Sequence, residues 1–161
     1  MGSGVAPRGT SYRTHEGRPS RILFLDVDGV LHPGPNVPTL LTHMCWLPQL
    51  ERLLTGHSDV AVVVHSTWRY RYELAELREL FGNLGARVID VAPDGERYDS
   101  IRQWVSWHQG PGLTYRILDD EAGEFPIPPP AELILCDTRR GLGDPAVQAK
   151  LRDWLRKKET Q

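Results

Sequence analysis

The sequence has no lysine before Lys150, only two cysteines, and no apolar run longer than a strand. A membrane-spanning helix needs about 20 consecutive apolar residues, and the N-terminal residues lack the apolar core of a signal peptide, so a cytoplasmic protein without a membrane partner is expected. Cys45 and Cys136 lie far apart, without the spacing of a metal site. Buried free thiols are the favoured interpretation, and a disulfide remains the alternative. Any site that needs a positively charged side chain from a residue before 150 must use arginine or histidine.

The length of 161 residues predicts one domain with one core. Hydrophobic residues make up 40% of the chain and charged residues 25%, which are the values of a globular protein. Residues 1–20 are rich in Gly, Ser, Arg, Pro and Thr and are interpreted as a flexible tail, which leaves 21–158 as the domain. The net charge of −2 gives no general attraction to a polyanion, so a nucleic-acid role would need a local positive patch.

Strand and helix patterns alternate from residue 21 onward. Predicted strands cover residues 21–27, 59–65, 86–91, 114–118 and 132–136, and predicted helices cover residues 44–54, 70–81, 99–108 and 145–157. This alternation predicts an α/β fold, a Rossmann-like three-layer α/β/α sandwich with a mostly parallel five-stranded sheet. Only a Pro/Gly-rich loop, 32–38, and one helix separate the first two strands, so no large cap domain is expected.

The most informative segment runs from Ile22 to Leu31, where an apolar strand leads into Asp26, Asp28 and Gly29. Alternate residues of a strand point the same way, and a turn at this point would gather the two carboxylates around one centre. Two acids so placed either bind a hard cation or divide the roles of nucleophile and acid/base. An ordinary Asp-Gly turn is the alternative, and it predicts no further polar groups at neighbouring strand ends.

Polar side chains do follow two other predicted strands. Ser66 and Thr67 come after the second strand, and Asp119 and Asp120 come at the end of the fourth. In parallel sheets, ligands bind at the carboxyl ends of the strands. Mg²⁺ prefers oxygen ligands in an octahedral shell. The sequence therefore predicts a Mg²⁺ site built from Asp26, the Asp28 segment, and one or both of Asp119 and Asp120.

The segment Leu25-Asp-Val-Asp-Gly-Val-Leu31 resembles the first motif of the haloacid dehalogenase superfamily, whose members are mostly magnesium-dependent phosphatases. The resemblance implies that Asp26 is a nucleophile that forms an aspartyl-phosphate. It also implies that Asp28 protonates the leaving oxygen and later activates water. A phosphotransferase would use the same intermediate with another acceptor, and the sequence does not separate the two reactions.

Two shorter motifs are less specific. Ser66 takes the place of the superfamily's second motif, a hydroxyl on the phosphoryl group, with Thr67 as its neighbouring substitute; a helix N-cap is the alternative. The third motif is usually a lysine, which this chain lacks there, so Arg97 is predicted to bind phosphate, with Arg102 in reserve. A solvated arginine at a helix end is the alternative for each.

The sequence also supports expectations for four other residues near these motifs. Arg69 is expected to face the substrate, and Trp68 is expected in the core. His32 follows the first motif closely enough to contact substrate or metal, although a lone histidine in a loop more often does neither, and His65 is expected to pack at the strand end.

Three segments narrow the resemblance. Ser66-Thr-Trp-Arg69, Ile117-Leu-Asp-Asp-Glu121 and Cys136-Asp-Thr-Arg-Arg-Gly141-Leu142 are similar to the small haloacid-dehalogenase-like domains named for Swiss Army Knife RNA repair proteins. The resemblance covers about residues 21–155 and implies a phosphatase that acts on RNA or nucleotide ends. A site without a cap suits bulky phosphorylated substrates such as RNA or DNA ends. A catalytically weak domain that binds a phosphorylated partner is the second hypothesis, because the usual lysine is missing. The sequence predicts no oligomeric state.

Overall fold

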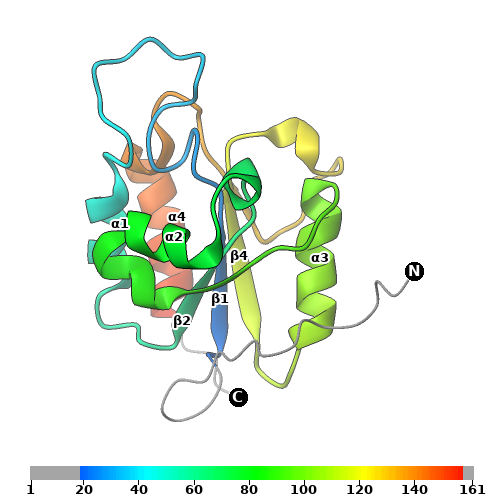
Figure 1. Ribbon diagram of the computed structural model, residues 1–161. Helices are drawn as coiled ribbons and strands as arrows, with labels where there is room; N and C mark the ends of the chain where they lie inside the picture. The colour runs from blue at the N-terminus through cyan, green and yellow to red at the C-terminus, as the bar shows by residue number, and fades with distance from the viewer. Residues whose placement is uncertain (1–18, 158–161) are drawn as a thin grey trace.

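The computed structural model describes residues 19–157, so most of the predicted tail, and residue 158, lie outside the described part of the chain. Five parallel strands form one sheet in the order β3-β2-β1-β4-β5, and Figure 1 labels its three central strands, β2, β1 and β4. The strands are β1 Arg21–Leu25, β2 Val60–Val64, β3 Val88–Val91, β4 Thr114–Asp119 and β5 Leu133–Leu135. The predicted α/β fold is confirmed, and the sheet is parallel throughout.

Four α-helices cover the two faces of the sheet. They are α1 Leu47–Leu54, α2 Leu74–Leu80, α3 Arg97–His108 and α4 Pro145–Arg156. Short 3₁₀ helices are η1 Thr67–Tyr70, η2 Gly82–Arg87, η3 Ala122–Glu124 and η4 Gly141–Gly143. Figure 1 shows α1, α2 and α4 on one side of the sheet and α3 on the other, which gives the three predicted layers.

The central strand β1 is apolar at almost every position because both of its faces are covered. Leu23 and Leu25 belong to the core that packs against α1, α2 and α4, whereas Ile22 and Phe24 belong to the core beneath α3. All five residues of the strand are buried. A strand covered on both faces has no solvent side, so its sequence does not alternate between apolar and polar residues.

Two helices begin later than the sequence predicts. α1 starts at Leu47 instead of residue 44, because Met44 has a φ of 62°, which is incompatible with a right-handed helix. The expected helix from residue 70 is divided into η1 and α2. The second part starts after Glu73, whose side chain and that of Glu76 form a reciprocal capping box.

The connection from β1 to α1 rises above the carboxyl end of the sheet (Figure 1). Among the described residues, no segment between β1 and β2 forms a second domain, which agrees with the expected absence of a large cap. None of the helices at residues 19–157 has the length and hydropathy needed to cross a membrane. Cys45 and Cys136 are both free, as predicted, but only Cys136 is buried and Cys45 is half-buried.

The segment after β5 returns to brace the turn that follows β1. The backbone N–H of Leu142 donates to the carbonyl of Val30 over 2.8 Å. Gly141 has a φ of 47°, and a Cβ there would meet the Val30 carbonyl and the Trp46 ring at 2.6 Å. Asp144 then caps α4, its carboxylate accepting from the N–H of Ala146 over 2.9 Å.

Candidate functional site

Three of the four predicted acids, Asp26, Asp28 and Asp120, meet the predicted Arg97 in one hollow at the carboxyl end of the sheet. β1 lies between β2 and β4, so the residues that follow or end these strands are neighbours in space. The hollow has a volume of about 560 Å³. We call it the acidic hollow, and its polar lining includes Asp26, Asp28, Thr67, Arg97, Asp120 and Glu121.

The turn after β1 fixes the two carboxylates of the first motif. The Val27 carbonyl accepts from the N–H of Leu31 over 2.8 Å, and the N–H of Gly29 donates to the His32 carbonyl over 2.8 Å. Gly29 has a φ of 82°, and a Cβ at this position would overlap the carboxylate of Asp120. Glycine is therefore required by the backbone conformation and by the close approach of Asp120.

Asp28 is held from two sides. Its Oδ1 lies 2.7 Å from Nε2 of His32, and the indole N–H of Trp68 donates to its Oδ2 over 3.3 Å. Nδ1 of His32 accepts from the backbone N–H of Met44 over 3.0 Å, so the proton of the neutral ring lies on Nε2. Sequence reasoning missed this role of His32, and the spacing of four residues across a Gly turn is the only signal for it.

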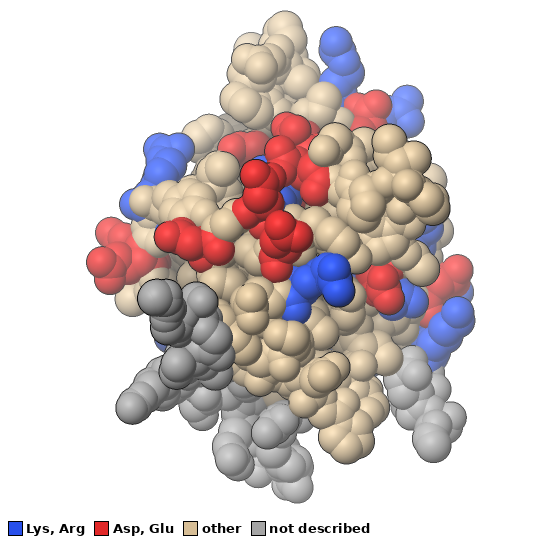
Figure 2. Space-filling model, turned by 90° about the vertical axis from the view of Figure 1, so that its right-hand side faces the viewer, with Lys and Arg blue, Asp and Glu red and all other residues tan. Residues whose placement is uncertain are grey.

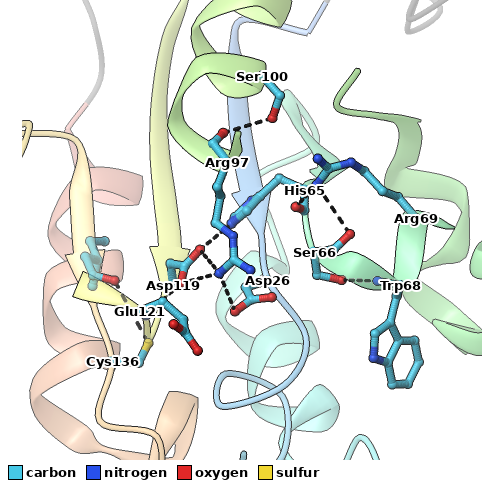
Figure 3. Close-up of polar contacts among 11 residues, drawn as sticks. Asp26, His65, Ser66, Trp68, Arg69, Arg97, Ser100, Asp119, Glu121 and Cys136 are labelled. Atoms are coloured by element: carbon cyan, nitrogen blue, oxygen red, sulfur yellow. Dashed lines mark hydrogen bonds and ion pairs between the residues drawn. The ribbon is translucent and has the colours of Figure 1, made fainter. Parts of the chain in front are cut away.

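Asp119 lies beneath the hollow in a network of three charged or polar side chains. It is fully buried, and its Oδ2 lies 2.7 Å from Nε2 of His65. Arg97, in the first turn of α3, donates from Nη1 to both carboxylate oxygens of Asp119 over 3.0 and 3.1 Å, and the same nitrogen lies 3.6 Å from Oδ2 of Asp26 (Figure 3). The guanidinium therefore bridges the carboxylates that follow β1 and end β4.

The environment moves the pKa values of these two carboxyl groups apart. Burial, followed by the charge of Asp119, raises the pKa of Asp26 well above its ordinary value. Burial also acts to raise the pKa of Asp119, but the hydrogen bond and charge of His65 and the charge of Arg97 outweigh it, so the pKa is lowered. Without a further cation, Asp119 holds the negative charge and Asp26 tends to hold a proton.

His65 is fully buried and was expected only to pack at the strand end. Burial, the largest effect, lowers the pKa of its imidazole, although the hydrogen bond with Asp119 opposes this. Its Nδ1 has no hydrogen-bond partner among the described residues. Both features fit an imidazole that is neutral at pH 7 and carries its proton on Nε2. This nitrogen donates to Asp119, and Nδ1 carries no hydrogen that would need an acceptor.

One ligand atom each from Asp26, His65 and Asp119 lie within 4.8 Å of one another. The carboxylate oxygens of Asp119, a predicted metal ligand, are already bonded to His65 and Arg97, and a hard divalent cation prefers oxygen to the imidazole nitrogen, so Asp26 is the member of this group best placed to bind one. Asp120 lines the same hollow as Asp26, and its charge adds to the rise in the pKa of Asp26, which a bound cation would offset. Among residues 19–157, nothing donates a hydrogen bond to the Asp28 backbone carbonyl, which leaves this oxygen free for a ligand.

The two predicted hydroxyl residues are placed differently. Ser66 is 1% exposed, and its Oγ accepts from the N–H of Trp68 over 3.0 Å, so it caps η1. Thr67 is exposed and lines the acidic hollow. Of the two predicted positions, the structure therefore places Thr67 in the lining of the acidic hollow and leaves the buried Ser66 outside that lining.

Two other arginines named from the sequence lie outside the hollow. Arg69 donates to the backbone carbonyls of His65 and Gly95, which ties the end of β2 to the segment before α3 and leaves it no place facing the substrate. Arg102 is exposed and lies over the ring of Tyr98 at 5.9 Å. Arg97 is thus the arginine that the structure brings to the acids.

Acidic residues border the α3 side of the hollow. Figure 2 shows Asp and Glu side chains gathered in the upper part of this face. The exposed acids of the segments that lead into α3 and follow β4 are Asp94, Glu96, Glu121 and Glu124. A polyanion approaching from this side would be repelled.

Comparison with known families gives one match. The family described as the HAD domain in Swiss Army Knife RNA repair proteins matches residues 22–147, where HAD denotes haloacid dehalogenase. No curated protein and no solved structure matches the chain significantly. The matched range contains every predicted site residue.

Proposed function

The chain belongs to the family of HAD domains in Swiss Army Knife RNA repair proteins, and on this premise we propose that it is a Mg²⁺-dependent phosphomonoester hydrolase. The proposed substrates are the phosphorylated ends of nucleic acids or nucleotides. The observation that carries the proposal is the meeting of Asp26, Asp28 and Arg97 in one hollow with Asp120. Phosphatase-type chemistry is what the family suggests, and the substrate and mechanism are our proposal.

In the proposed first step, a carboxylate oxygen of Asp26 attacks phosphorus and the bond from phosphorus to the leaving oxygen breaks. Asp28 gives its proton to that oxygen, and the alcohol leaves. In the second step, Asp28 takes a proton from water, which attacks the phosphorus of the aspartyl-phosphate. Inorganic phosphate leaves and Asp26 is restored.

Charge control falls to Arg97 and Thr67. The guanidinium, 3.6 Å from Asp26, offsets the charge of the phosphoryl group and remains charged at any working pH. The hydroxyl of Thr67 lines the same hollow and can donate to a phosphoryl oxygen. Ser66 supports this arrangement by capping η1, which begins at Thr67.

The residues that would hold the cation are Asp26, Asp120 and the backbone carbonyl of Asp28. When bound, Mg²⁺ supplies positive charge that polarises the phosphoryl oxygens. Asp26 must be ionised to attack, and its raised pKa opposes ionisation in the protein alone. This need for compensating charge is the physical reason for proposing a metal-dependent enzyme.

The test is phosphate release from p-nitrophenyl phosphate and from 3′- and 5′-phosphorylated oligonucleotides, with Mg²⁺ or with EDTA. Asp26→Asn should abolish turnover and keep the cooperative unfolding transition. Asp153→Asn is the matched control, since Asp153 is exposed on α4 and pairs only with Arg156 among the described residues. Full activity of Asp26→Asn would show that Asp26 is not the nucleophile.

A second candidate function is a phosphate-binding domain with little turnover. Arg97, which replaces the usual lysine, is held by two hydrogen bonds to Asp119, so part of its charge is already compensated. Binding of a phosphorylated oligonucleotide by the wild-type protein without phosphate release would favour this candidate. Multiple turnovers on any phosphomonoester would exclude it.

A further inference from the structure

A second hollow lies beside the acidic hollow, and Asp28 lines both. It has a volume of about 320 Å³ and shares Pro35 and Val37 with the acidic hollow as well. We call it the side hollow. It lies between the loop after β1 and the start of η1, and its remaining polar and aromatic lining includes His32, His43, Trp68 and Arg71.

The position of Asp28 indicates which part of a substrate the side hollow would hold. This inference rests on the proposed function, in which Asp28 protonates the leaving oxygen. The phosphoryl group must then lie with Asp26 and Arg97 in the acidic hollow, and the leaving oxygen must lie at Asp28. The rest of the leaving group continues beyond Asp28, where the side hollow begins.

The lining of the side hollow combines planar rings with one cation. The rings of His32 and His43 stack at 4.7 Å with an interplanar angle of 17°, and His43 lies 6.3 Å from Trp68. His43 is exposed, whereas Trp68 is buried, so His43 is the ring that a ligand can reach. An exposed ring of this kind can stack with a nucleobase.

Arg71 supplies a positive charge at the rim of the side hollow. It is exposed, lies over the Tyr72 ring at 5.5 Å, and forms no ion pair with any described residue. Asp28 is the only carboxylate in the lining of this hollow. The opposite side of the site carries Glu121 and the other exposed acids near α3, so a polyanion is directed away from α3 and toward Arg71.

We propose that the side hollow is the leaving-group subsite and that it binds the terminal nucleoside of a phosphorylated nucleic-acid strand. The base stacks on His43, and the next phosphodiester contacts Arg71. The volume lies near the lower end of the range of about 300 to 1,000 Å³ for small-molecule sites, which suits one nucleoside. The shape and charge thus select a strand end by its last nucleoside and the phosphate that follows.

The kinetic test compares substrates that fill the subsite to different extents. They are p-nitrophenyl phosphate, a nucleoside monophosphate, and a dinucleotide with a terminal phosphate at either its 3′ or its 5′ end. Arg71→Ala should lower kcat/KM for the dinucleotide by about tenfold and change the first two by less than about twofold, because only the dinucleotide carries the second phosphate. His43→Ala should lower kcat/KM for the nucleotide substrates and leave kcat/KM for p-nitrophenyl phosphate unchanged.

Arg52→Ala is the matched control, since Arg52 is exposed on α1 and lines neither hollow. It should leave all four rates unchanged. The dependence of kcat/KM on salt should also become shallower by about one phosphate contact in Arg71→Ala and stay the same in Arg52→Ala. Equal losses on every substrate, or no loss in Arg71→Ala, would overturn the subsite.

A binding measurement separates the subsite from the chemistry. Fluorescence anisotropy of a labelled, terminally phosphorylated oligonucleotide is measured with Asp26→Asn, and with the same variant carrying Arg71→Ala or Arg52→Ala. Weaker binding with Arg71→Ala alone supports the subsite even if the wild-type protein releases no phosphate, which is the outcome that would refute the proposed function. Equal binding by the three proteins would overturn the subsite, whatever the turnover.

Discussion

His32 and Asp28 are joined by a hydrogen bond of 2.7 Å that fixes which oxygen of the carboxylate faces the imidazole. The ring is itself held by the N–H of Met44, a residue with a φ of 62°, and it is buried. A non-glycine residue in the left-handed region costs free energy. In this conformation the backbone N–H of Met44 donates to Nδ1 of His32. The ring proton therefore lies on Nε2, which donates to Asp28.

We predict that His32→Leu slows turnover most for substrates with poor leaving groups. Loss of the donor frees the Asp28 carboxylate to rotate, and a misplaced acid matters most when the leaving oxygen needs its proton. The expected loss is about 10- to 100-fold in kcat for an alkyl phosphate and much less for p-nitrophenyl phosphate. The measurement is kcat and KM for both substrates. His32→Gln, which keeps an amide donor, should recover part of the rate, and an equal loss on both substrates would contradict the positioning role.

Gly29→Ala should weaken Mg²⁺ binding beyond its effect on stability. An added Cβ overlaps the carboxylate of Asp120 and displaces it. Gly56→Ala is the matched control, because Gly56 has a φ of 87° and nothing within 4 Å of an added Cβ. Both variants should lose roughly 1 to 2 kcal/mol of unfolding free energy from the backbone alone. Isothermal titration with Mg²⁺ should show an affinity loss of about tenfold or more only in Gly29→Ala; equal affinity in the two would contradict the role of Asp120.

Asp26→Asn should stabilise the metal-free protein at neutral pH. Burial and then the charge of Asp119 raise the folded-state pKa of Asp26 above the value of about 3.9 in unfolded chains. The folded state therefore loses stability as the pH rises from about 4 through the folded pKa. Removing this ionisation should raise the free energy of unfolding by roughly 1 to 3 kcal/mol at pH 7 in EDTA.

Urea unfolding at several pH values checks this prediction. The difference between Asp26→Asn and the wild-type protein should shrink below pH 4, where both side chains are neutral. Adding Mg²⁺ should stabilise the wild-type protein more than the variant. A variant that is less stable than the wild type in EDTA at pH 7 would show that ionisation of Asp26 does not destabilise the folded protein.

Arg97→Ala should destabilise the fold as well as the site. The substitution leaves the fully buried Asp119 with His65 as its remaining side-chain partner. Removing one partner of a buried ion pair costs about 3 to 5 kcal/mol. Urea unfolding should show a loss of this size, and a smaller one in Arg97→Lys. In a double-mutant cycle, Asp119→Asn should restore much of the loss; additive effects would contradict the pairing.

The sequence predicts the fold well because local patterns and sheet position agree. Five apolar runs of strand length are separated by amphipathic segments, and a parallel sheet covered on both faces requires such runs. The helix boundaries were less predictable. The left-handed conformation of Met44 depends on the loop that encloses it, and no propensity marks it.

The sequence also brings the acids and Arg97 together, because strand ends in a parallel sheet meet at one edge. It does not show how the side chains divide their contacts. The hydrogen bond from Trp68 to Asp28 joins residues from two different strand ends, and the burial of Asp119 beneath Arg97 depends on the angle at which α3 packs. Such contacts arise from tertiary packing and leave no periodic signal.

The hydrogen bond between Leu142 and Val30 has a consequence for the protein during its synthesis on the ribosome. Within the domain, the turn that carries Asp26 is translated before its acidic neighbour Asp120 and before its brace in η4. A nascent chain that stops before η4 therefore holds Asp26 without the surroundings that shape the turn. If the proposed function holds, activity requires translation as far as η4, and a fragment that ends before η4 should carry none.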